Sequence, residues 1–122
     1  DVLDLEINEA LVLFASVPRL YRALQVLQKI GLGYLALGQQ SHSLSGGEAR
    51  RVRIAMELMK IQEHQSSDLI FIDNPTDGLH AFDQQNIFTI MDEIMFRGGS
   101  FIVASHSEEF FKMAHHKVFL SV

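Results

Sequence analysis

The sequence predicts an α/β fold in which helices cover a parallel sheet. Two short apolar runs, residues 69–72 and 101–104, have the length and composition of strands that are buried on both faces. A segment with a helical pattern, about residues 82–97, separates them, and Gly98 and Gly99 stop it. A strand, a helix and a second strand in this order indicate parallel strands joined by a right-handed crossover.

Helices are expected to fill the chain before the first strand. Residues 8–15 predict a short helix with Asn8 as its N-cap. Pro18 marks the first position of a second helix, where a missing N–H group costs nothing, and Gly31 is expected to end it. Residues 31–43 are polar and spotted with glycine, which is typical of a loop.

A longer helix is expected over residues 46–61, and its start carries a capping box. Ser45 is placed as the N-cap and Glu48 follows three residues later, so each side chain can bond the backbone amide of the other residue. After the second strand, residues 108–114 predict a short helix and residues 118–122 predict a third strand.

Composition limits the classes of protein that remain. The chain has 122 residues, no cysteine and a net charge of −5, and its 48% of hydrophobic residues suffices for a packed core. No apolar run approaches the roughly 20 residues of a membrane span, and a disulfide scaffold is excluded. The negative charge argues against strong binding of nucleic-acid backbones by this segment alone. We expect a helical segment, residues 1–61, and an α/β segment, residues 62–122, with both chain ends cut from a longer protein.

The five residues Leu44, Ser45, Gly46, Gly47 and Glu48 carry the strongest chemical signal. A serine and two glycines at a helix start present a hydroxyl and backbone amides without obstruction, and the helix dipole adds partial positive charge. This combination suits an anion such as a phosphate. An ordinary capped helix is an equally good interpretation of these residues taken alone.

Two polar residues follow the predicted strands. Asp73 comes directly after the first strand, and His106 comes two residues after the second. Ligands on parallel sheets bind at the carboxyl ends of the strands, so both side chains are candidates for a site. Taken singly, an apolar run that ends in aspartate and one histidine after a strand are more often structural.

In this order, the segments LSGGEARRVRIAMEL, LIFID, NPTDGLH and SH resemble the motifs of the ABC-type ATPases. The resemblance implies a partial P-loop NTPase-like domain with a helical signature subdomain. It implies that residues 44–48 bind the terminal phosphate of ATP held by an opposing half, that Asp73 ligates magnesium, and that His106 is the switch histidine. It also assigns the D-loop, which runs along a dimer interface, to Asp77, Gly78, Leu79 and His80.

One position departs from the family pattern. LIFID resembles the Walker B strand, which ends in Asp73. ABC ATPases place a glutamate after the Walker B aspartate to activate the attacking water, whereas this chain has Asn74. An amide can orient a water molecule but cannot accept its proton, and general-base catalysis contributes about 100- to 10,000-fold. We expect ATP binding to persist at this site and hydrolysis to be slow.

Arg50, Arg51 and Arg53 are expected to form a basic face on the helix that follows the signature motif. Such faces are mostly solvated. Pairing with acidic residues across a dimer, or contact with DNA, is the alternative interpretation.

The stretch from Val17 to Leu58, with its LGYLALGQ lead-in, resembles the UvrA family of DNA-damage-recognition ATPases. Residues 1–14 and the NPTDGLH segment share the resemblance, which thus covers nearly the whole chain. The resemblance implies a cytoplasmic ATPase of bacterial nucleotide excision repair, part of the excision nuclease and the SOS response, that binds DNA, forms a homodimer and loads UvrB. No G-x-x-x-x-G-K-[ST] phosphate loop occurs, so we expect the isolated chain to lack ATPase activity. The alternatives are a catalytically impaired regulatory module and an ABC ATPase with a transporter or chromosome-structure role.

Overall fold

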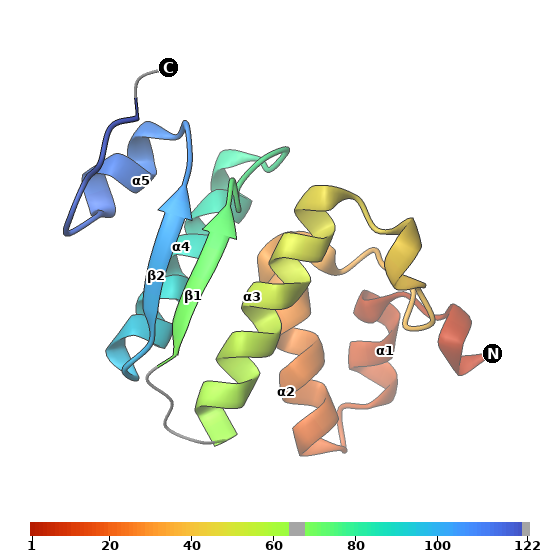
Figure 1. The fold of residues 1–122 in the computed structure, drawn as a ribbon. Coiled ribbons are helices and arrows are strands. Elements are labelled where there is room, and N and C mark those ends of the chain that lie inside the picture. The colour runs from red at the N-terminus through yellow and green to blue at the C-terminus, as the bar shows by residue number, and fades with distance from the viewer. Residues whose placement is uncertain (64–67, 121–122) are drawn as a thin grey trace.

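Apolar residues that recur every three or four positions build the helical first half of the chain. The computed structural model describes residues 1–63 and 68–120, and three helices lie side by side there: α1 (Ile7–Leu13), α2 (Pro18–Leu27) and α3 (Gly46–Glu63) (Figure 1). A π-helical turn, Gln28–Leu32, follows α2, and Gly31 adopts a φ of +79° within it. Only glycine takes this conformation without steric cost, which explains why the helix predicted from Pro18 ends here.

The start of α1 differs from the prediction. Glu6 is the N-cap and forms a capping box with Glu9, whose Oε2 accepts the Glu6 amide at 2.9 Å. Asn8 lies inside the helix, where its side-chain oxygen accepts from Nε2 of Gln28 at 2.9 Å. The prediction of Asn8 as N-cap is therefore wrong, because the carboxylates of Glu6 and Glu9, on either side of Asn8 in the sequence, accept the free amides instead.

The loop between α2 and α3 is held close to the N-terminus. An isolated antiparallel bridge joins Glu6 and Ala36, and short 3₁₀ turns form at Val2–Asp4 and Ser41–Ser43. The segment predicted as a loop is thus irregular but bonded to the start of the chain.

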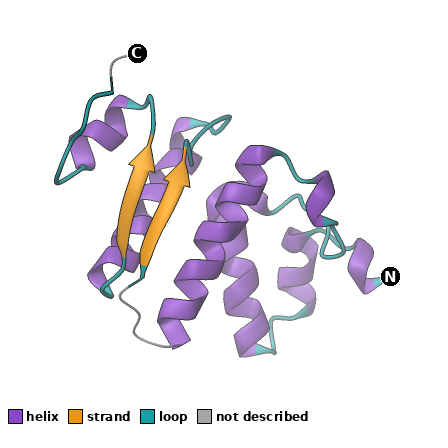
Figure 2. Ribbon diagram, in the orientation of Figure 1, coloured by secondary structure: helices purple, strands orange, loops and turns teal. Residues whose placement is uncertain are grey.

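The second half contains two parallel strands joined by a helix, as predicted (Figure 2). Strand β1 (Leu69–Asp73) pairs with β2 (Ser100–Ala104) so that Asp73 lies opposite Ala104. Helix α4 (Ala81–Phe96) makes the crossover, and the short helix α5 (Glu108–Met113) follows β2. The two strands therefore deliver the residues that follow them to one edge of the sheet.

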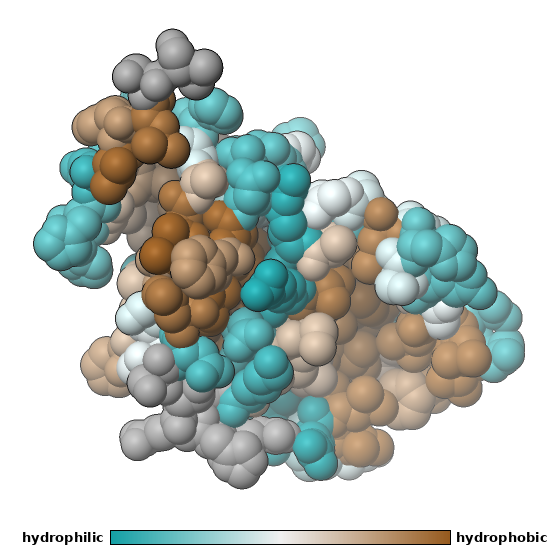
Figure 3. Space-filling view, viewed as in Figure 1, coloured by the Kyte–Doolittle hydropathy of each residue, from teal (hydrophilic) through white to brown (hydrophobic). Residues whose placement is uncertain are grey.

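A single hydrophobic core joins the two halves. It includes Ile54 and Leu58 of α3, Ile70 of β1, and Ile87 and Ile94 of α4, all at most 2% exposed. Among the residues that the structure describes, no element covers the opposite face of the sheet. Leu69, Phe71 and Ile102 on that face are 53%, 58% and 52% exposed, and a hydrophobic patch lies over the strands in Figure 3. The expectation of strands buried on both faces is wrong, because helices pack against only one of them.

The predicted third strand does not form over residues 118–120, and residues 121–122 lie outside the described part of the chain. Val118, Phe119 and Leu120 are 78%, 79% and 89% exposed. The ring of Phe119 stacks on that of Phe111 of α5, with centroids 5.2 Å apart. Residues 118–120 are thus largely exposed, and Phe119 contacts the preceding helix through its ring.

In the part of the chain that the structure describes, no helix combines the length and the apolar character needed to cross a membrane.

Candidate functional site

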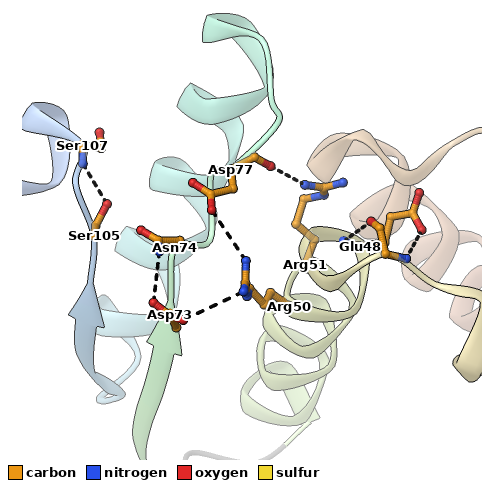
Figure 4. Close-up of polar contacts among 9 residues, drawn as sticks. Glu48, Arg50, Arg51, Asp73, Asn74, Asp77, Ser105 and Ser107 are labelled. Carbon is orange, nitrogen blue, oxygen red and sulfur yellow. Dashed lines mark hydrogen bonds and ion pairs between the residues drawn. The ribbon is translucent and has the colours of Figure 1, made fainter.

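The start of α3 is closed by the predicted capping box. The Glu48 amide donates to Ser45 Oγ at 3.2 Å, and the Ser45 amide donates to Glu48 Oε2 at 2.8 Å (Figure 4). The first amides of a helix have no acceptor within the helix, so those of Gly46 and Gly47 remain directed outward at the positive end of the dipole. Ser45 and Gly46 are exposed and Gly47 is half-buried, so an anion can approach.

Tyr34 also contacts the start of α3, and this role was not predicted from the sequence. Its hydroxyl donates to Glu48 Oε1, the carboxylate oxygen that is not used by the capping box. The hydrogen bond from Tyr34, followed by that from the Ser45 amide, lowers the pKa of Glu48. The same bond to Glu48, together with desolvation, raises the pKa of the Tyr34 phenol. The tyrosine within the LGYLALGQ segment is the sequence feature that could have indicated a role for Tyr34 at this site.

At the carboxyl end of β1 the chain turns sharply. Asp73 is exposed, and Asn74 has a φ of +42°, a conformation that asparagine tolerates better than most residues. The Asn74 amide donates to the carbonyl of Ala104 at 2.8 Å, and its Nδ2 donates to Asp73 Oδ1 at 3.1 Å. The side chain of Asn74 is therefore turned toward the aspartate.

Two successive turns form the segment after Asn74. The Asp77 amide donates to the Asn74 carbonyl at 3.3 Å, and the Leu79 amide donates to the Thr76 carbonyl at 3.2 Å. Gly78 has a φ of +73° and no atom within 4 Å of its missing Cβ, so conformation rather than space requires glycine. Asp77, Gly78 and His80 are exposed, whereas Thr76 is buried and anchors the segment.

Two arginines connect α3 to this segment. Arg50 forms ion pairs with Asp73 Oδ2 at 3.9 Å and with Asp77 Oδ2 at 3.8 Å. Arg51 is 5% exposed and donates from Nη1 to the Asp77 carbonyl at 3.4 Å (Figure 4). The prediction of a solvated basic face is therefore wrong for Arg50 and Arg51, because adjacent positions point to different sides of a helix. Of the three arginines, only Arg53 is exposed.

His106 lies two residues beyond β2 and is exposed. Its neighbour Ser105 accepts the Ser107 amide at 3.0 Å, which turns the chain into α5. In residues 1–63 and 68–120, neither a hydrogen bond nor an ion pair joins His106 to Asp73. The structure thus brings Asp73 and Asp77 to the first turns of α3 through Arg50 and Arg51. It places His106 after the neighbouring strand.

Known proteins resemble this chain along most of its length. The UvrABC system protein A of Staphylococcus epidermidis is 39% identical over 116 residues, and that of Oceanobacillus iheyensis is 40% identical over 116 residues. Both matches cover 95% of this chain but 12% of the relative. The crystal structure of UvrA2 from Deinococcus radiodurans superimposes with a TM-score of 0.79 at 37% identity, covering 88% of this chain and 13% of that one. No protein-family model matches the chain.

The parallel strands, the helical layer and the superposition define the chain as part of a P-loop NTPase-like domain of the ABC ATPase class. The sequence match extends over 95% of the chain, and the structural neighbour is a UvrA2. The chain is homologous to a limited region of UvrA proteins and spans about 12% of the length of the curated relatives it matches.

Proposed function

We propose that this region supplies half of a composite ATP site in a longer UvrA-type ATPase. Leu44, Ser45, Gly46, Gly47 and Glu48 would form the turn that meets the terminal phosphate of ATP bound by the opposing half. The observation that carries the proposal is the capping box, which turns the carboxylate of Glu48 back onto Ser45 and leaves two glycine amides outward at the dipole's positive end. An ordinary helix cap needs no pair of glycines there.

The residues after the strands suit a second, separate nucleotide in the longer protein, to which this chain would contribute without a phosphate loop of its own. Asp73 presents an exposed carboxylate at the carboxyl end of β1, and magnesium prefers oxygen ligands of this kind. Bound there, magnesium would neutralise phosphate charge. Asp73 would hold the ion, and His106 would approach the terminal phosphate from the neighbouring loop. Asp77, Gly78, Leu79 and His80 would run along the interface between the two halves.

Asn74 makes slow hydrolysis the expected behaviour of this site. Its amide can orient a water molecule but cannot take its proton, and it already donates to Asp73 at 3.1 Å. A catalytically impaired module that binds ATP to regulate its partners is therefore the second candidate function. In either case the isolated chain is expected to show no ATPase activity, since it contains no phosphate loop.

The relatives' name places them in the UvrABC system, and we infer the same setting for the whole protein that contains this region. It would be a cytoplasmic ATPase of nucleotide excision repair that acts on DNA as a homodimer and passes damaged sites to a UvrB-like partner. The net charge of −5 argues against a strong contact of this segment with the DNA backbone.

Two variants of the full-length protein test the proposal. Ser45→Arg places a bulky side chain over the α3 start and should abolish the preference for ATP over ADP, measured by titration with a fluorescent nucleotide. Retention of that preference would contradict the phosphate role. Asn74→Glu should raise ATP turnover if this site limits hydrolysis, and the phosphate-release rate measures it. Unchanged turnover would mean that this site never limited hydrolysis.

A further inference from the structure

Glu48 poses an electrostatic problem within the proposed phosphate site. A carboxylate in the first turn of a helix that faces a phosphate would repel it, and the amides of Gly46 and Gly47 would gain nothing from lying beside it. The structure resolves the conflict by holding both carboxylate oxygens. Oε2 accepts the Ser45 amide at 2.8 Å, and Oε1 accepts the Tyr34 hydroxyl.

Tyr34 is itself held on a rigid support. Its neighbour Leu35 is 8% exposed, donates its amide to the Leu32 carbonyl at 3.1 Å, and accepts the Ile7 amide at 2.9 Å. On the other side, the Gly33 carbonyl accepts the Asn8 amide at 2.9 Å. The backbone on both sides of Tyr34 is therefore fixed against α1, while its ring is 54% exposed and reaches across to α3.

We propose that Tyr34 is a positioning residue for the nucleotide site, because its hydroxyl holds the Glu48 carboxylate against Ser45 and away from the phosphate. Without this bond, Glu48 keeps only the Ser45 amide and can swing toward the outward amides. The inference rests on the proposed function, and it deepens that function by assigning control of the anion site to the lead-in segment. Arg51 supports the arrangement, since its charge also favours the ionised carboxylate.

The test uses the full-length protein and separates the hydroxyl from the ring. Tyr34→Phe should weaken binding of a non-hydrolysable ATP analogue about three- to tenfold, the range expected for the net contribution of one ordinary hydrogen bond. Binding of ADP should not change, because ADP lacks the terminal phosphate. Tyr21→Phe is the matched control: Tyr21 is the chain's other tyrosine, half-buried on α2.

A second variant distinguishes positioning from a merely structural role. Glu48→Gln removes the charge that must be held away, so adding Tyr34→Phe to it should change affinity for the ATP analogue by less than about twofold. Thermal unfolding of each variant reports on the fold. The proposal is overturned if Tyr34→Phe weakens ATP and ADP binding equally, if it matches the Tyr21 control, or if its effect persists undiminished in the Glu48→Gln background.

Failure of this proposal and failure of the proposed function give different results. If Ser45→Arg abolishes the preference for ATP while Tyr34→Phe leaves it intact, only the role of Tyr34 falls. If Ser45→Arg has no effect, the phosphate site itself is absent and both proposals fall.

Discussion

The two adjacent glycines at the start of α3 should respond in opposite ways to replacement by alanine. A Cβ built on Gly46 has only the Arg50 guanidinium nearby, at 3.8 Å, which is ordinary van der Waals contact. A Cβ built on Gly47 lies 3.1 Å from Arg51 Nη1 and 3.3 Å from the Asp77 carbonyl oxygen. Alanine is therefore accommodated at the first position and crowded at the second.

The magnitudes follow from these contacts. Alanine is favoured over glycine in a helix by up to about 1 kcal/mol, so Gly46→Ala should be neutral or slightly stabilising. At Gly47 the same gain is opposed by overpacking, which costs about 1–3 kcal/mol. Arg51 is 5% exposed and cannot swing into solvent, so its bond to the Asp77 carbonyl must stretch or break. That loss adds about 1 kcal/mol. Because the gain from helix propensity is common to both variants, we expect Gly47→Ala to be about 2–4 kcal/mol less stable than Gly46→Ala.

Urea unfolding followed by circular dichroism measures this difference. Thermal unfolding should place Gly47→Ala several degrees below its neighbour, because one kcal/mol corresponds to about 3–5 °C for a chain of this size. Equal stabilities for the two alanine variants would refute the argument that the α3 start and the D-loop segment are in firm contact.

Three further predictions concern charge and burial. Because the pKa of Glu48 is lowered from 4.5, the stability it contributes is present above that pH and lost as pH falls through the lower value. The wild-type protein should therefore be more stable than Glu48→Gln near neutral pH and lose this difference in stability only in acid. Urea unfolding at a series of pH values measures the difference. Ile72→Ala should cost about 2–4 kcal/mol, whereas Phe71→Lys on the exposed face should reduce aggregation, seen by light scattering, at little cost. Arg50→Met should cost at most about 1 kcal/mol and less in high salt, and Arg53→Met should cost nothing measurable in the same titration.

Local features of this fold were predictable because they depend on neighbours in sequence. The capping box of Ser45 and Glu48 and the helix end near Gly31 follow from a few adjacent residues, and both are confirmed. The predicted N-cap of α1 was wrong because Asn8 and Glu6 both offer oxygen acceptors. Which of the two caps the helix depends on how the chain enters it.

Features that depend on distant partners were not predictable in the same way. An apolar run such as residues 69–72 does not reveal which of its faces a helix will cover, and residues 118–120 carry a strand composition without a strand beside them. In the site, Asp73 was placed by its position after a strand. The bonds that Tyr34 and Arg51 make across elements required the fold, because residues 14 and 26 positions apart meet in them.

The backbone at Asn74 also limits what chemistry can be installed there. Its φ of +42° is a left-handed conformation in which asparagine, aspartate and glycine are at ease and a longer side chain such as glutamate is not. A carboxylate introduced as aspartate would keep the turn but reach less far, and one introduced as glutamate would reach further at a conformational cost of about 1 kcal/mol or more. The backbone conformation at this position favours aspartate, whereas reach favours glutamate. A comparison of ATP turnover in Asn74→Asp and Asn74→Glu therefore separates the two effects.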